Sequence, residues 1–268
     1  MRDQLVLRPI GVVRSPFKTT REVPLGGGRA TLEIAEPFAE GLDGLEHSSH
    51  LIVMGLLHLA DRTVLKARPV KFDPAAPPRG VFSSRSPVRP NPVSVTVVPL
   101  LSRDGTRLEV DRLDLLDGTP IVDLKAYCPA CDSIFSARHA HRVGPEEIED
   151  ARFAEYLERD LENFMGQAAG GEAARWALAA TFVATRGFGI DPHDPRLRIE
   201  VNRVGVEAEA LLAMTGAGCF NRRLGISQGP GPLRFGFEHS GRRTALTARG
   251  AAPGEALLSW REAFEIEG

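Results

Sequence analysis

Hydrophobic and polar residues alternate along most of the first half of the chain, in short runs separated by glycine, proline and aspartate. Alternation with a period of two predicts strands that bury one face, and many short strands between turns predict a barrel or a sandwich. We therefore expect a β-rich first half with no long helix before residue 144. The expected strands cover residues 5–13, 30–35, 50–59, 93–101, 107–116 and 121–124.

The hydrophobic pattern changes at Gly144-Pro145, where a proline followed by two glutamates is typical of a helix start. Apolar residues at helical spacing then predict three helices, and β-branched or alternating runs predict three strands. The predicted fold is mixed: a small all-β barrel over residues 1–143, followed by a smaller α+β domain over residues 144–268. In chain order, the expected elements of the second domain are a helix within 145–164, a helix at 173–185, a strand at 198–201, a helix at 204–214, and a hairpin of strands 234–238 and 243–247.

Composition and charge indicate a globular protein of the cytoplasm. The 268 residues are 43 % hydrophobic and 25 % charged, which suits one large domain or two ordinary ones. No apolar run approaches the length of a membrane span, no secretory signal opens the sequence, and three cysteines give no disulfide framework. Residues 1–143 carry 19 Lys and Arg against 16 Asp and Glu, whereas residues 144–268 carry 14 against 19. The mildly basic first half suits a domain that binds an anion.

Three segments of the first half combine unusual residues. They read IGVVRSPF at 10–17, RSPVRPNP at 85–92 and DLLDGTPIVDLKAY at 114–127. The prolines of the second segment restrict the backbone, so they predict a stiff, extended loop that holds Arg85 and Arg89 in place. The third segment predicts a strand, a tight Asp117-Gly118 turn and a second strand.

In this order and at this spacing, with SHLIV before His58, the segments resemble the TsaA-like (TrmO-like) methyltransferase family over about residues 5–135. The resemblance implies a small β-barrel that binds S-adenosylmethionine, usually at the interface of a homodimer. It also implies N6-methylation of the threonylcarbamoyl-adenosine beside the tRNA anticodon. The cofactor residues implied by the motifs are Gly27, Gly28, Arg29, His58, Leu59, Arg85, Val95, Asp111, Arg112, Leu113 and Asp114. Further motif residues are Arg89, Asn91, Asp117, Gly118, Thr119, Lys125 and Tyr127.

The residue types at these positions suit such a cofactor. Arg85 could pair with the methionine carboxylate, and a carboxylate such as Asp114 could accept hydrogen bonds from ribose hydroxyls. The glycines allow the backbone to approach a ligand closely. Methylation of an adenine amine also needs a proton acceptor, for which Asp114 and Asp117 are the candidates and neither is preferred.

The second half departs from the family. Its C-terminal tRNA-binding segment, with the wording DPRPAY, is missing, and residues 194–197 imitate only its start. A small-molecule acceptor held by the second domain is therefore an alternative, favoured by the acidic charge of that domain. Residues 202–224 weakly resemble domains of the E type found in formylmethanofuran dehydrogenase, and Arg222 and Arg223 could meet an anionic acceptor. A second alternative is a non-catalytic module that binds S-adenosylmethionine or metal.

Two cysteines and two histidines form the one metal-like set in the sequence. Cys128, Cys131, His139 and His141 could in principle make a tetrahedral zinc site. Their spacing is not that of a standard zinc finger, so we favour a structural or incidental role for the cysteines and expect no metal. A redox role is less favoured, because no βαβ unit follows the cysteine pair.

Overall fold

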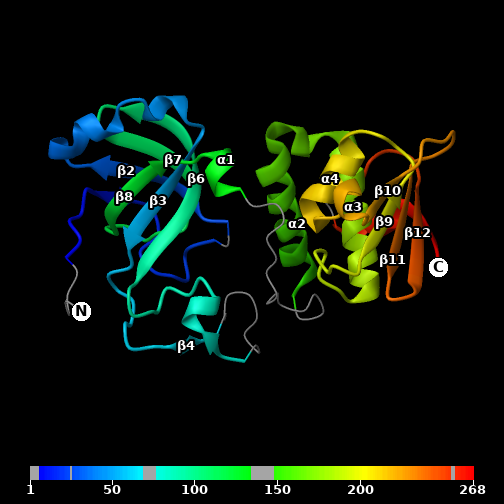
Figure 1. Cartoon of the computed structure of the whole chain (residues 1–268), viewed down its shortest axis with the longest axis horizontal. Helices are drawn as coiled ribbons and strands as arrows, with labels where there is room; N and C mark the ends of the chain where they lie inside the picture. The colour runs from blue at the N-terminus through cyan, green and yellow to red at the C-terminus, as the bar shows by residue number, and fades with distance from the viewer. Residues whose placement is uncertain (1–5, 25, 69–76, 134–147, 255–256) are drawn as a thin grey trace. The chain divides into compact units, whose positions relative to one another are not determined.

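The computed structural model describes residues 6–24, 26–68, 77–133, 148–254 and 257–268 (Figure 1). The chain divides into two compact units, residues 1–134 and 135–268, and each has its own buried hydrophobic cluster. The domain boundary predicted at residue 143 and the helix start predicted at Gly144-Pro145 lie outside the described residues. The described part of the first long helix begins at Asp150.

The first unit is a closed barrel of six antiparallel strands in the order β1-β2-β7-β6-β3-β8. The strands are β1 Gly11–Arg14, β2 Gly28–Ile34, β3 His50–Leu56, β6 Val93–Asp104, β7 Arg107–Leu113 and β8 Pro120–Ala126. Alternation builds the core: Leu51 and Val53 of β3, like Leu108 and Val110 of β7, have no exposed surface. The predicted small all-β barrel is confirmed.

Short elements occupy the loops between the barrel strands. They are η1 Glu36–Leu42, η2 Leu45–His47, β4 Lys66–Ala67, β5 Arg79–Gly80, η3 Val81–Ser83 and α1 Pro129–Asp132. The sequence pattern predicts none of them, because each is too short to show a hydrophobic period. Two of them matter below: η3 opens the proline-rich loop, and α1 carries the cysteine pair.

The second unit packs helices on one face of a five-stranded sheet, as Figure 1 shows for α2, α3 and α4. The sheet order is β10-β9-β11-β12-β13, with β9 and β10 parallel and the other pairs antiparallel. The predicted α+β class is confirmed. The helices are α2 Asp150–Met165, η5 Gly166–Gly170, α3 Glu172–Phe188, α4 Val206–Thr215, η6 Cys219–Asn221 and α5 Leu257–Glu262. The strands are β9 Arg198–Val201, β10 Leu224–Ile226, β11 Arg234–His239, β12 Arg242–Ala248 and β13 Phe264–Glu267.

Alanine and aromatic residues build the core of the second unit. In α3, Ala177, Ala179 and Ala180 have no exposed surface, so the small side chains let the helix pack closely on several sides. Phe235 and Phe237 fill the sheet side of this core. Within the part of the chain that the structure describes, no helix is long and apolar enough to cross a membrane.

Candidate functional site

The three motifs converge on one end of the barrel. Because neighbouring strands are antiparallel, the last residues of β1, β3 and β7 lie at the same end as the first residues of β2, β6 and β8. Register shows this directly: Leu56 at the end of β3 pairs with Val93, and Gly28 at the start of β2 pairs with Leu113. The predicted cofactor residues on or directly beside these strand ends therefore share one rim, which we call the motif rim.

A close backbone approach shapes the motif rim where β2 begins. Gly27 has a φ of +72°, and a Cβ atom built there would lie 2.4 Å from the carbonyl carbon and oxygen of Arg112, so only glycine fits. Arg112 itself has a φ of +57°, a conformation that a non-glycine residue rarely adopts. Its N–H donates to the Asp111 carboxylate at 2.8 Å. This kink breaks the alternation of β7, so Leu113 points into the core with no exposed surface.

Strand β6 connects two of the predicted cofactor residues to the rest of the motif rim. Thr96 donates its hydroxyl to Asp114 Oδ1 at 2.7 Å, and the Arg85 guanidinium donates through Nη2 to the Val95 carbonyl at 2.5 Å. Arg85 is exposed, and Val95 keeps 42 % of its surface exposed. A guanidinium, a carboxylate and an apolar side chain thus lie beside one another and in reach of solvent.

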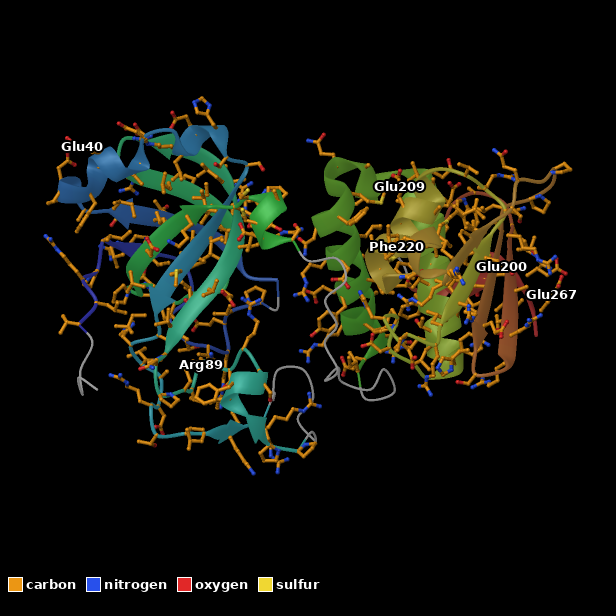
Figure 2. The ribbon with its side chains drawn as sticks, viewed as in Figure 1. Glu40, Arg89, Glu200, Glu209, Phe220 and Glu267 are labelled. Carbon is orange, nitrogen blue, oxygen red and sulfur yellow. The ribbon has the colours of Figure 1, made fainter. Side chains whose placement is uncertain are left out.

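The stiff loop predicted at residues 85–92 is closed by one arginine. Arg89 donates to the main-chain oxygens of Val81, Ser84 and Ser86 at 2.9, 2.7 and 2.8 Å (labelled in Figure 2). Three carbonyls thus engage its guanidinium, which clasps the loop shut. Of the two arginines that the sequence places in this loop, Arg89 positions the loop and Arg85 faces solvent.

The Asp117-Gly118 turn joins the first and third motifs. Asp117 Oδ1 accepts the Ser15 N–H at 3.1 Å, and its Oδ2 forms an ion pair with Lys18 Nζ at 2.7 Å. These two hydrogen bonds, the one from Lys18 first, hold the pKa of the Asp117 carboxyl below its ordinary value. Gly118 has a φ of +76° and donates its N–H to the Val13 carbonyl at 2.9 Å. The turn is therefore tied to β1, and the Asp117 carboxylate is already engaged.

An open depression of about 340 Å³ lies beside this turn. Two of its lining residues, Arg29 and Asp117, are motif residues that the sequence singles out. The depression does not reach Arg85, Val95 or Asp114. Its lining is Arg14, Ser15, Pro16, Arg29, Ala30, Thr31, Glu109 and Asp117.

The remaining motif residues are spread along the barrel. His58 and Leu59 follow the end of β3, and Leu59 keeps 72 % of its surface exposed. Asn91 precedes β6, and its carbonyl accepts the Val93 N–H at 2.8 Å. Thr119, next to β8, is buried. Lys125 and Tyr127 belong to the far end of β8, away from the motif rim; Lys125 pairs with Asp123 at 2.7 Å.

Outside the motifs, the predicted residues are placed as follows. Arg223 donates to the carbonyls of Asp194 and Thr215, both at 2.9 Å, whereas Arg222 is exposed. Cys128 and Cys131 are exposed, and His139 and His141 lie outside the described residues. Among the residues that the structure describes, no group of three or more His, Cys, Asp or Glu could hold a metal ion.

Sequence reasoning misses the polar partners that organise the motif rim. Ser15 lies inside the first motif, but no role is predicted for it, and Lys18 lies one residue beyond that motif. Thr96 directly follows Val95. Their contacts with Asp117 and Asp114 depend on strand register, and the only signal in the sequence is their adjacency to motif residues.

Residues 12–133 match the tRNA-methyltransferase O N-terminal domain family. An S-adenosyl-L-methionine-binding protein of Archaeoglobus fulgidus is 42 % identical over 134 residues, which are 48 % of this chain and 94 % of that protein. This chain belongs to the family.

Two further relatives carry this family's name or activity. The tRNA (adenine(37)-N6)-methyltransferase of Escherichia coli is 34 % identical over 166 residues, covering 57 % of this chain and 70 % of that protein. A crystal structure of TrmO is 36 % identical, with a TM-score of 0.44, and the match covers 53 % of this chain and 66 % of that one. The family match ends at residue 133, so it assigns nothing to the second unit.

Proposed function

We propose that this protein is a cytoplasmic enzyme that transfers a methyl group from S-adenosylmethionine to the N6 atom of an adenine in tRNA. We further propose that the adenine is the threonylcarbamoyl-adenosine beside the anticodon. The observation that carries the proposal is the convergence of the family's motifs on one rim of the barrel. The relative from Escherichia coli, which is named for methylation of adenine 37, supports the acceptor.

The residues of the motif rim fit S-adenosylmethionine, whose sulfonium supplies an electrophilic methyl group. Arg85 offers a solvent-facing guanidinium for the carboxylate of the methionine part. Asp111 and Asp114 offer acceptors for ribose hydroxyls. Val95 and Leu59, both exposed and apolar, suit the faces of an adenine ring. In this arrangement the protein binds and orients the reactants and excludes water.

The geometry favours Asp114 over Asp117 as the group that takes a proton from the acceptor amine. A general base needs a free oxygen and a pKa that is not depressed. Both oxygens of Asp117 already accept hydrogen bonds, and the contact with Lys18 lowers its pKa. Asp114 accepts one hydrogen bond from the Thr96 hydroxyl through Oδ1. Asp117 therefore holds the turn, and Asp114 serves the reaction.

A homodimer is part of this proposal. Val95, Val97 and Leu101 on the outer side of β6 keep 42 %, 44 % and 48 % of their surface exposed, so an apolar stripe runs along one strand. A second copy of the chain would cover such a stripe. Because Val95 also belongs to the motif rim, the same contact would complete the cofactor site across two barrels.

The second unit is proposed to select the acceptor. Its sequence is acidic, with 14 Lys and Arg against 19 Asp and Glu over residues 144–268, and this charge favours a small-molecule acceptor over the tRNA backbone. Arg222 is the exposed cation of its predicted acceptor side. A small-molecule acceptor is therefore the second candidate function.

One experiment separates the two candidates. Purified full-length protein is incubated with S-adenosylmethionine carrying a labelled methyl group, with either tRNA from cells lacking this modification or a panel of metabolites. The tRNA is then digested to nucleosides and analysed by mass spectrometry. Labelled N6-methyl threonylcarbamoyl-adenosine supports the main proposal. Label only in a metabolite would move the function to the second candidate, and label in neither would refute both.

A further inference from the structure

Two exposed cysteines share a single turn just beyond β8. Cys128 precedes the four-residue helix α1, and Cys131 lies within it; the side chains of both are exposed. Since β8 begins at the motif rim, the end of β8 that leads to Cys128 lies at the opposite end of the barrel. The pair is thus separate from the proposed cofactor site and contributes nothing to the hydrophobic core.

Hydrogen bonds hold this turn closed. The Cys128 carbonyl accepts the N–H groups of Cys131 at 2.9 Å and of Asp132 at 2.8 Å, and the Cys128 N–H donates to Asp132 Oδ2 at 2.7 Å. A contact of 2.8 Å between the Tyr127 hydroxyl and the Ser133 hydroxyl spans the whole turn. The backbone therefore keeps the two cysteines three residues apart on one turn.

The sulfur of Cys128 receives more hydrogen bonds than that of Cys131. The N–H of Cys131, the thiol of Cys131 and the N–H of Ala130 all lie within hydrogen-bonding reach of Cys128 Sγ, and together they lower the pKa of the Cys128 thiol. The same thiol contact raises the pKa of Cys131. One sulfur of the pair is therefore prepared to attack, and its neighbour is held close as a protonated thiol.

We propose that Cys128 and Cys131 form a thiol–disulfide exchange site for low-molecular-weight disulfides. The Cys128 thiolate attacks one sulfur of the small disulfide; a mixed disulfide forms, and the first small thiolate leaves. Cys131 then loses its proton and attacks the Cys128 sulfur, which closes the Cys128–Cys131 bond and releases the second small thiolate. The protein dithiol loses two electrons and the small disulfide gains them. A small dithiol reductant reverses both steps.

The structure changes the balance of alternatives that the sequence leaves open. A structural role would require buried sulfur atoms, but both cysteines are exposed. Zinc binding would require further ligands close to the pair, and the described residues supply no such group. In a reducing compartment, an exposed vicinal pair is typical of redox sensing or catalysis and not of structural bonds.

The test uses the third cysteine, Cys219, which is also exposed, as an internal control. Reduced full-length protein is mixed with glutathione disulfide, quenched with a maleimide at short times, and mapped by peptide mass spectrometry. Cys128 is expected to react at least about tenfold faster than Cys219, and the final product is a bond between Cys128 and Cys131. Equal rates at Cys128 and Cys219 would overturn the proposal.

Two variants separate the attacking thiol from the resolving one. Cys131→Ser should accumulate a stable mixed disulfide between Cys128 and glutathione, whereas Cys128→Ser should lose the fast reaction. Cys219→Ser should behave as wild type, and a thermal melt of each variant shows that the fold is retained. Zinc bound one-to-one in protein purified without chelators, and lost in Cys128→Ser, would overturn the proposal in favour of a metal site.

Discussion

The Asp194 carboxylate is the clearest local determinant of stability in the second unit. Arg196 donates to it through Nε at 3.0 Å and Nη2 at 2.7 Å, and also through its main-chain N–H at 2.9 Å. The ring of His239, which is buried, lies 3.2 Å away. These contacts, the Arg196 side chain first, lower the pKa of Asp194 from 3.8 to about 2. Asp194→Asn keeps the shape of the side chain and removes its charge.

The pKa shift sets the size of the effect. A drop from 3.8 to about 2 corresponds to about 2.5 kcal/mol of unfolding free energy. The Arg196 side chain is 66 % exposed, so solvent screens part of this interaction. We therefore expect Asp194→Asn to cost about 1–2 kcal/mol at pH 7. Because folding lowers this pKa, the contribution is fully present above 3.8 and is lost as the pH falls through about 2.

Urea denaturation followed by tryptophan fluorescence measures this effect cleanly. The only tryptophans, Trp176 and Trp260, are both buried in the second unit, so the signal reports the unfolding of the unit that holds Asp194. The difference between wild type and Asp194→Asn should stay constant from pH 7 to about pH 5 and shrink below pH 4. Glu209→Gln, at an exposed position of α4 (labelled in Figure 2), is the control. No loss at pH 7, or a difference that grows in acid, would refute the reasoning.

Three further predictions concern the barrel. Arg85→Ala should weaken S-adenosylmethionine binding by about 2–3 kcal/mol in calorimetry, because a charge-assisted pair is lost. Asp114→Asn should lower kcat for methyl transfer by about 100-fold or more with little change in melting temperature, whereas Asp117→Asn should lower the melting temperature and leave kcat closer to wild type. Val97→Asp should weaken the dimer at least about tenfold in light scattering, with Val204→Asp in the second unit as its control.

Each of these predictions has a contrary outcome. Equal affinities of wild type and Arg85→Ala would remove this arginine from the cofactor site. A larger loss of kcat in Asp117→Asn than in Asp114→Asn would exchange the two proposed roles. Wild-type protein that remains a monomer while it methylates its acceptor would show that the exposed stripe on β6 is not a dimer interface.

The regular elements follow from local patterns, and the motif rim does not. Alternation is long enough in β3 and β7 to predict strands, and Ser240-Gly241 predicts a hairpin turn, which the structure confirms with φ angles of +51° and +84°. β10 and β13, with three and four residues, are too short to show a period. The regular pattern thus decides which elements can be predicted from sequence.

The geometry of the motif rim depends on contacts between residues far apart in the chain. The positive φ of Arg112 cannot be predicted from arginine itself; it accompanies the close approach of Gly27 from another strand. The contact between Thr96 and Asp114 depends on how β6 lies beside β7. Motif resemblance indicates which residues gather there, but only the strand register shows which of them touch.

Photochemical crosslinking of radiolabelled S-adenosylmethionine to the full-length protein tests the location of the cofactor site most directly. After irradiation, the protein is digested and the labelled peptides are sequenced. We predict label in peptides from the motif rim, above all residues 85–97 and 111–117, and less label when Arg85 is replaced by alanine. Label confined to residues 135–268, or to the opposite end of the barrel around Tyr127, would contradict this location.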